Sequence, residues 1–269
     1  MQNWFITTEI VEKIVVSAGK YIRNRMDGDF VTSFKSCPAD MVTEVDQHSQ
    51  SIILEGLEKA FPDHRLVAEE GFDEEELLYD EKPVWFIDPL DGTANFVFGI
   101  PLYAVTVAMT IHGSPVLGIT YDPIRDEIFT AIKGNGAYRN GKRIQVNSRE
   151  RLSESLITTG FPSADHFKDD MWKANYKKLF YKAADIRALG TAALELAYIA
   201  CGRLTGYWEV ALRPWDVAAG ILLVSEAGGK VSNLNGSELE LGRHVSIVAS
   251  NGLIHRELLD DLGFATAES

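Results

Sequence analysis

Trp85 to Phe96 reads WFIDPLDGTANF, an apolar run that ends at an aspartate and is followed by a turn and a second aspartate. Val84 to Ile87 is short, apolar and rich in β-forming residues, which predicts a buried strand with Asp88 at its end. Pro89 cannot donate a ladder hydrogen bond and is expected to stop this strand, so that Asp91 can turn back toward Asp88. Two carboxylates close together in a partly buried place need a cation, and hard oxygen ligands without Cys or His favour magnesium, manganese or calcium over zinc. Magnesium is the ion we expect here.

The residues after the second aspartate suit a phosphate group. Gly92 has no Cβ, so a phosphate can approach its backbone closely. If Thr93 to Phe96 begins a helical turn, the N–H groups of Gly92 and Thr93 point at that phosphate. A lone D-x-x-D-G sequence is more often a strand and turn with solvated aspartates, so the rest of the chain decides between that interpretation and a metal-and-phosphate site.

The composition is that of a globular protein with a full hydrophobic core. The chain has 269 residues, 46% of them hydrophobic, and a formal net charge of −13 at pH 7. This charge argues against polyanionic partners, so we expect neither nucleic acid nor a membrane surface to bind it. A small phosphate-bearing substrate stays possible, because a bound metal reverses the sign of the charge locally.

The chain lacks the sequence features of exported and membrane proteins. Glu9 and Glu12 lie where a signal peptide would be basic and then apolar, and no apolar run approaches the ~18 residues of a membrane span. Cys37 and Cys201 form no motif and no disulfide framework, so both are expected to be free thiols. We therefore expect a cytoplasmic protein.

Further acidic residues stand where a strand ends or a helix begins. Arg65 to Ala68 is a predicted strand that is followed by Glu69, although adjacent glutamates are normally solvent charges. Asp46 and Asp216 each open a predicted helix, where an aspartate is by default the N-cap. At Gly190 to Ala192 a strand again runs into a helix, and the free N–H groups of such a helix end suit a hydroxyl or an anion.

The remaining elements follow from hydrophobic periodicity and turn signals. The first predicted helix, at residues 4–25, has one apolar stripe. Its members are Ile6, Ile10, Ile14, Val15, Ala18, Tyr21 and Ile22. The other predicted helices lie at residues 46–61, 169–181 and 251–262. An antiparallel meander is predicted over residues 104–111, 116–121 and 127–132, a hairpin at Asn140-Gly141 and a crossing segment at 142–151. Further strands are predicted at residues 156–159, 184–189, 204–209, 230–232 and 245–250.

Two of these motifs carry a resemblance to a known family. DPLDGTANF after WFI resembles the first signature of the inositol monophosphatase family of magnesium-dependent, lithium-sensitive sugar phosphatases, and WDVAAG at Trp215 to Gly220 resembles the second. The similarity continues through KSCPAD at Lys35 to Asp40, AEE at Ala68 to Glu70 and GTAA at Gly190 to Ala193. It implies an α/β protein with the layered αβαβα sugar-phosphatase fold. It also implies a single catalytic domain over 1–269, with an N-terminal α+β half at about 1–145 and a C-terminal α/β half at about 146–269.

The resemblance assigns roles to individual residues. Two or three magnesium ions are expected on Glu69, Asp88, Leu90, Asp91, Thr93 and Asp216. The expected substrate-binding residues are Asp91, Gly92, Thr93, Gly190, Thr191, Ala192, Glu209 and Asp216. Glu69, Thr93 and Asp46 are the candidate catalytic residues: Glu69 orients the attacking water, and Asp46 accepts the Thr93 hydroxyl proton so that Thr93 can take one from the water.

The resemblance favours a compact polyol phosphate, with myo-inositol 1-phosphate as the first choice, hydrolysed by water without a covalent intermediate. Fructose 1,6-bisphosphate, NADP and 3'-phosphoadenosine phosphate remain alternatives within the superfamily, and a non-catalytic magnesium-binding protein on the same scaffold is a remote one. The aspartyl-phosphate class needs its two aspartates two positions apart, whereas Asp88 and Asp91 are three apart. The chain has no Gly-rich dinucleotide loop or Walker loop, so NAD and ATP are not expected as cofactors. The family resemblance also implies a homodimer.

Overall fold

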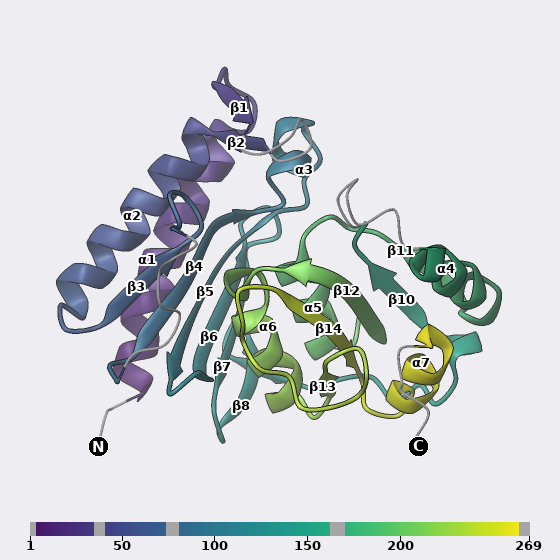
Figure 1. Ribbon diagram of the computed structural model, residues 1–269. Helices are drawn as coiled ribbons and strands as arrows, with labels where there is room; N and C mark the ends of the chain where they lie inside the picture. Colours follow the sequence, from purple (N-terminus) through teal and green to yellow (C-terminus); the bar gives the residue numbers. More distant parts are fainter. Residues whose placement is uncertain (1–3, 35–40, 74–80, 162–169, 264–269) are drawn as a thin grey trace.

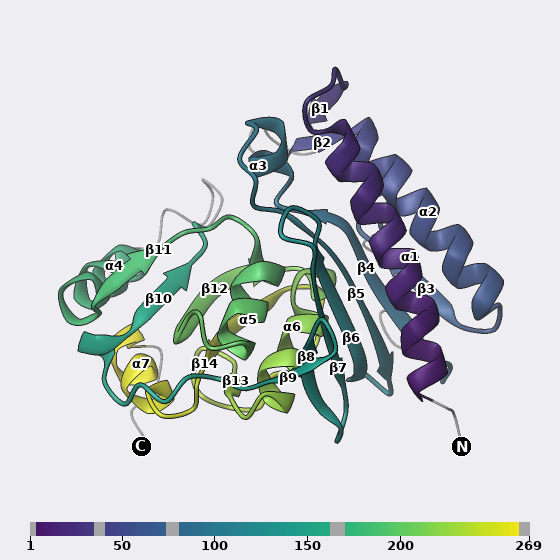
Figure 2. The ribbon, with the colours of Figure 1, turned by 180° about the vertical axis from the view of Figure 1, so that it is seen from behind.

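The computed structural model describes residues 4–34, 41–73, 81–161 and 170–263. These residues form five layers, with two helices on one sheet, two helices between the two sheets and two helices outside the second sheet (Figures 1 and 2). The predicted layered αβαβα arrangement is therefore confirmed. The KSCPAD segment, with Cys37, lies outside the described residues. None of the described helices is long and apolar enough to cross a membrane.

The first large sheet has seven strands in the order β3-β4-β5-β6-β7-β8-β9. Only β3 and β4 pair in parallel, and the rest is an antiparallel meander, as the turn signals predict. The strands are β3 Arg65–Ala68, β4 Val84–Asp91, β5 Ala104–Ile111, β6 Ser114–Asp122, β7 Glu127–Ile132, β8 Gly136–Arg139 and β9 Lys142–Ile144. Asn140 and Gly141 connect β8 and β9 with positive φ angles of 49° and 72°, which confirms the hairpin.

Both faces of this sheet are covered, which explains the continuous apolar run in β4. Alternate side chains of a strand point to opposite faces. Trp85 and Ile87 accordingly belong to the core that includes α1 (Trp4–Arg25) and α2 (Glu44–Ala60), whereas Phe86 belongs to the core that includes α5 (Ala192–Ala200) and α6 (Pro214–Glu226). The buried apolar residues of α1 are Val11, Val15, Ala18 and Ile22. The N-terminal part of the predicted stripe is wrong, because Ile6 and Ile10 are exposed.

The second large sheet has five strands in the order β11-β10-β12-β14-β13. Its strands are β10 Leu156–Thr159, β11 Asp185–Arg187, β12 Gly206–Leu212, β13 Lys230–Ser232 and β14 Val245–Ser250, and the helices outside it are α4 Asp170–Lys182 and α7 His255–Leu262. The closing helix begins at His255, four residues later than predicted, because Asn251 uses its side chain to cap a turn over Leu253 and Ile254. Residues 142–144 of the predicted crossing segment form β9 instead, and the rest of it runs from β9 toward β10 along the lower edge of the molecule in Figure 2.

Smaller elements complete the described chain. A two-stranded antiparallel sheet joins β1 (Thr32–Phe34) to β2 (Met41–Thr43), α3 spans Thr93–Val97, and a short 3-10 helix spans Leu152–Glu154. Figure 1 places β1, β2 and α3 at the same end of the molecule, beyond the ends of β4 and β5.

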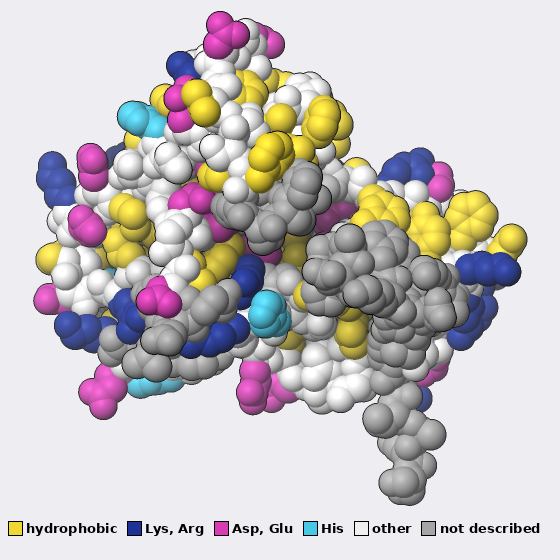
Figure 3. All heavy atoms as spheres, turned by 45° about the horizontal axis from the view of Figure 1, so that its top comes forward, with side chains coloured by type: hydrophobic (Ala, Val, Ile, Leu, Met, Phe, Trp, Pro, Cys, Tyr) yellow, Lys and Arg dark blue, Asp and Glu magenta, His cyan; other side chains and the backbone are white. Residues whose placement is uncertain are grey.

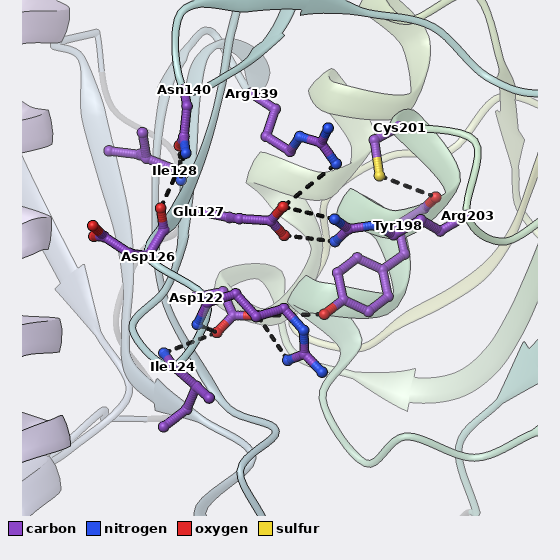
Figure 4. A network of polar contacts seen from close by, with 11 residues as sticks. Asp122, Ile124, Asp126, Glu127, Ile128, Arg139, Asn140, Tyr198, Cys201 and Arg203 are labelled. Carbon is purple, nitrogen blue, oxygen red and sulfur yellow. Dashed lines mark hydrogen bonds and ion pairs between the residues drawn. The ribbon is translucent and has the colours of Figure 1, made fainter.

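An ionic network fastens α5 to the meander (Figure 4). Arg203, just past the C-terminal end of α5, donates two hydrogen bonds of 2.6 Å to the carboxylate of Glu127 on β7. Arg139 on β8 lies 3.4 Å from the same carboxylate. Tyr198 on α5 donates to Asp122 at 3.3 Å, next to the ion pair of Asp122 with Arg125. The C-terminal end of α5 is thereby held against the first sheet.

Candidate active site

One pocket gathers nearly all the residues that the sequence singled out. It lies where β4 ends, between the N-terminal ends of α3, α5 and α6. Figure 3 looks onto this end of the molecule and shows acidic side chains in the hollow, with hydrophobic side chains over α3 and α4 beside it. The pocket is lined by Glu69, Asp88, Leu90, Asp91, Gly92, Thr93, Gly160, Phe161, Gly190, Thr191, Ala192, Glu209, Leu212 and Asp216. Of the predicted site residues, Asp46 alone is not in the lining.

The end of β4 differs from the prediction in one respect. The strand does not stop at Pro89 but continues to Asp91, with a register shift on β5 between Asp88 and Asp91. This irregularity accommodates the missing N–H of the proline, since bulges are where a sheet tolerates proline. Leu90 donates its N–H to Asp88 Oδ1 at 3.0 Å, which bends the backbone around that carboxylate. Asp88 is thereby held, buried, at the base of the pocket.

Asp91 joins the first sheet to α5. Its Oδ2 accepts a hydrogen bond of 2.5 Å from the Thr191 hydroxyl and one of 2.7 Å from the Ala193 N–H. Thr191 is the N-cap of α5, so the carboxylate lies at the positive end of that helix. Two segments that lie 100 residues apart in the chain, DPLDGTANF and GTAA, therefore meet through one side chain.

Gly92 is required where the two segments approach most closely. It adopts a left-handed conformation with a φ of 95°, and an added Cβ would lie 3.1 Å from Leu102 O and 3.2 Å from Gly190 O. Asn95 on α3 fastens the same approach by donating to Leu102 O at 2.7 Å and Leu189 O at 2.8 Å. Only the spatial neighbours of Asn95 reveal this role, because its place in the motif does not distinguish it from a surface residue of α3.

Asp46 reaches the pocket through Thr93. Its Oδ1 accepts from the Thr93 hydroxyl at 2.8 Å, and its Oδ2 accepts from the Thr43 N–H at 2.9 Å and the Thr43 hydroxyl at 2.5 Å. The expectation that Asp46 is an N-cap is wrong: Thr43 is the N-cap of α2, and Asp46 is the third residue of the helix and the partner of Thr43 in a capping box. Burial raises the pKa of the Asp46 carboxyl, against the hydrogen bonds from Thr43 and Thr93 that favour its charged form. The Thr93 hydroxyl also lies 3.0 Å from Leu90 O.

Asp216 enters the pocket from α6. The default N-cap interpretation is again wrong, because α6 begins at Pro214 and the Asp216 carboxylate accepts the Arg213 N–H at 2.8 Å. The neighbouring Trp215 packs edge-to-face on Phe72, with ring centroids 4.9 Å apart. This contact brings the segment after β3, which carries Glu69, to the start of α6.

The acidic side chains of the pocket repel one another. Burial raises the pKa of Asp88 well above its ordinary value, and the negative charges of Glu69, Asp91 and Asp216 raise it further. Burial, with the charge of Glu69, also raises the pKa of Asp216 well above its ordinary value. For Asp91 burial raises the pKa to about 6, although the Thr191 and Ala193 hydrogen bonds oppose the shift. A cation placed among these groups would remove a repulsion that the fold maintains.

The donor set fits magnesium. The pocket lining offers carboxylate, hydroxyl and backbone carbonyl oxygens and, among the described residues, neither Cys nor His, which is the ligand chemistry of a hard cation. Leu90 can contribute only its carbonyl oxygen. With the side chains as they stand, no three His, Cys, Asp or Glu side chains of the described residues converge tightly enough to hold one ion. The fit is therefore one of donor chemistry and charge.

Glu209 lines the pocket from the second sheet. It lies on β12, where the fully buried Tyr207 donates its hydroxyl to Glu209 Oε2 at 2.5 Å. Burial is the main cause that raises the pKa of Glu209 to about 7, and the charge of Asp91 adds to it. Gly160, at the end of β10, lies directly beneath the Glu209 carboxylate. Sequence reasoning missed Gly160, Phe161, Leu212 and Tyr207, since none stands in a signature.

The fold and this site agree with comparisons to known proteins. The chain belongs to the inositol monophosphatase family, which matches residues 6–267. It is 42% identical over 236 residues to the Nus factor SuhB of Pasteurella multocida (strain Pm70), a match that covers 87% of this chain and 86% of that protein. It is 40% identical over 223 residues to the inositol-1-monophosphatase of Mesorhizobium japonicum (strain LMG 29417 / CECT 9101 / MAFF 303099), covering 82% of each chain.

A solved structure gives the same result at the level of the fold. The inositol monophosphatase of Anabaena (Nostoc) sp. PCC 7120 superposes with a TM-score of 0.85 at 34% sequence identity and covers 98% of each chain. Membership of this family, together with the acidic pocket, supports a phosphatase of this superfamily.

Proposed function

We propose that this protein is a magnesium-dependent phosphomonoesterase that hydrolyses a small polyol phosphate, with myo-inositol 1-phosphate as its first candidate substrate. The observation that carries the proposal is the meeting of Glu69, Asp88, Asp91 and Asp216 in one pocket beside Gly92 and the N-terminal end of α5. Carboxylates that raise one another's pKa suit a doubly charged cation, and adjoining N–H groups suit a phosphate. The name of the Mesorhizobium relative supports the choice of substrate.

The acidic residues of the pocket are the proposed magnesium ligands. Magnesium would be held by the carboxylates of Asp88, Glu69, Asp91 and Asp216, with the Thr93 hydroxyl and the Leu90 carbonyl oxygen as further ligands. Magnesium bound there would neutralise phosphate oxygens and lower the pKa of the attacking water.

Proton transfer and substrate positioning fall to this chain's own groups. Asp46 accepts the hydroxyl proton of Thr93, which leaves the Thr93 oxygen free to accept a proton from water. The N–H groups of Gly92 and Thr93 orient the phosphate, and the wall of Gly190, Thr191, Ala192 and Glu209 binds the leaving group.

The test measures phosphate release by the purified protein from myo-inositol 1-phosphate, fructose 1,6-bisphosphate, NADP and 3'-phosphoadenosine phosphate. We expect turnover that needs added magnesium, stops in chelator, is inhibited by lithium as in the family, and is fastest with the inositol ester. One turnover in ¹⁸O-water should place the label in phosphate. Full activity in chelator, or a phosphate trapped on Asp88 or Asp91, would contradict the mechanism.

A second candidate function follows from the names of several relatives. The protein of Pasteurella multocida is called a Nus factor, which is compatible with a binding role on the same scaffold. That role would keep the magnesium ligands without requiring turnover. The absence of phosphate release from all four esters, with magnesium still bound, would favour it. We also propose that the protein is a homodimer, which a sedimentation measurement tests directly.

A further inference from the structure

The position of Glu209 depends on a residue in another strand. Gly160 follows β10, which pairs in parallel with β12 so that Thr159 lies beside Trp208. The next residues along, Gly160 and Glu209, are therefore neighbours across the two strands. A Cβ built on Gly160 would overlap the carboxylate carbon and both carboxylate oxygens of Glu209. The Glu209 side chain lies in the space that a side chain at position 160 would fill.

The backbone conformation of Gly160 does not explain why this position holds a glycine. Thirteen other glycines of the described residues have a positive φ angle, whereas Gly160 does not, so a left-handed backbone is not the reason for a glycine here. What position 160 requires is the absence of a side chain. Glycine in or next to a strand often marks such a close approach.

A second contact holds the carboxylate in this place. Tyr207 and Glu209 lie two residues apart on β12 and so point to the same face of the sheet. The buried Tyr207 hydroxyl donates to Oε2 at 2.5 Å. Gly160 thus leaves room for the carboxylate and Tyr207 orients it.

The part of the pocket lining formed by Glu209 can accept hydrogen bonds. A carboxylate accepts hydrogen bonds from hydroxyl groups, and the pocket lining contributed by the described residues contains neither Lys nor Arg. Such a wall binds a leaving group that carries hydroxyls, and a site built to bind a hydroxyl discriminates against an ester that lacks it.

We infer that Gly160 is a specificity-determining residue: by leaving its Cβ space to Glu209 it lets Tyr207 aim that carboxylate at the hydroxyls of the leaving group. This inference rests on the proposed phosphatase function. Gly160 itself touches no reacting atom in this assignment and acts through the position of Glu209.

The test is a Gly160→Ala variant assayed with two esters. Myo-inositol 1-phosphate presents ring hydroxyls, whereas p-nitrophenyl phosphate presents none. The Glu209 carboxylate is the far end of a flexible side chain, so it can swing away from the new methyl group and the fold should survive. We expect the ratio of kcat/KM for the inositol ester to kcat/KM for the aryl ester to fall roughly 10- to 100-fold, as for loss of a hydrogen bond to a charged group. The fall should appear mainly in KM of the inositol ester.

Two further variants make the result decisive. Gly28→Ala is the matched control, because Gly28 is exposed, has no positive φ and would place its new Cβ 3.5 Å from the nearest atom, Arg25 O. It should leave the ratio unchanged. Tyr207→Phe keeps the ring in place but removes the hydroxyl, and it should lower the same ratio in the same direction.

The outcomes separate the inference from the function on which it rests. If the unaltered protein hydrolyses neither ester, the proposed function is wrong. If it hydrolyses both but Gly160→Ala slows them equally, or Tyr207→Phe leaves the ratio intact, position 160 affects only the general shape of the pocket and the inference is wrong. Unfolding curves for each variant show whether a loss of both activities reflects a loss of the fold.

Discussion

In the metal-free protein, the free energy of unfolding of the Asp91→Asn variant should rise, relative to that of the parent, as the pH is raised. Burial raises the pKa of Asp91 from 3.8 to about 6 in the folded protein. Between these values the folded chain holds a proton that the unfolded chain has lost. The stability of the parent therefore falls as the pH rises from about 4 through 6, and the deficit is complete above the folded pKa.

The size of the effect follows from this shift. A rise from 3.8 to about 6 corresponds to ~3 kcal/mol. Asp91 is partly exposed at the pocket, so solvent screening reduces the figure to roughly 2 kcal/mol. The amide oxygen of the substituted side chain can still accept from the Thr191 hydroxyl and the Ala193 N–H. Loss of the Asp91 charge also relieves the raised pKa values of Asp88 and Glu209, which adds to the change in the same direction. Costs of the substitution that involve no ionisation are the same at both pH values and cancel in the comparison.

The assay is urea unfolding in chelator at pH 4 and pH 8, followed by tryptophan fluorescence. The free energy of unfolding of the variant minus that of the parent should rise by roughly 2 kcal/mol between the two pH values, or roughly 4 °C in melting temperature for a chain of this size. Asp63→Asn, at an exposed position, is the control and should show no such rise. A difference for Asp91→Asn that is the same at both pH values would refute a desolvated charge in the pocket. Saturating magnesium should reverse the order, because the parent binds it more tightly.

Two further predictions address the relay and the network around α5. Thr93→Ala and Asp46→Asn should each lower kcat by ~10² to 10⁴. The double variant should be scarcely worse than the poorer single variant, because the effects of groups that act as a unit are not additive. If the two losses multiply instead, Asp46 serves only to cap α2. Arg203→Ala should lower the free energy of unfolding by ~1–2 kcal/mol at pH 7. Because Arg203 lowers the pKa of Glu127 in the folded protein, that loss should shrink as the pH falls below 4.5; a loss that does not change with pH would contradict this account.

Local sequence predicted the parts of the fold that depend on local physics. The meander, the Asn140-Gly141 hairpin and the strand at Val84 follow from alternation and turn chemistry, and the structure confirms them. Ile6 shows what periodicity cannot predict, because this residue of the predicted apolar stripe is 56% exposed. Periodicity identifies an apolar stripe but does not indicate where the surface that packs against it ends. The strand that continues past Pro89 shows the same limit, since a bulge is decided by the neighbouring strand.

The residues of the candidate site also differ in whether the local sequence predicts them. Asp88 and Asp91 stand in a motif whose residue types already imply a cation, and the structure places them in one pocket. Gly160 and Asn95 have no such signal, because the importance of each comes from atoms that are distant in the chain: a carboxylate on β12 for Gly160, and the carbonyl of Leu189 for Asn95. A glycine that only makes space cannot be recognised until its neighbour is known.

Helix α5 explains how residues so far apart in the chain are held in register. Its N-terminal end binds Asp91 of the first sheet through Thr191 and the Ala193 N–H, and just past its C-terminal end Arg203 binds Glu127 of the same sheet. A helix fixed to one sheet at both ends cannot slide along its axis without breaking one of these contacts. Because α5 also packs on β12, which carries the Glu209 wall, the distance across the pocket is set by the packing of α5 between the two sheets. The contacts of Arg203 are remote from the pocket, but they therefore belong to the set of contacts that fix α5 and position the site.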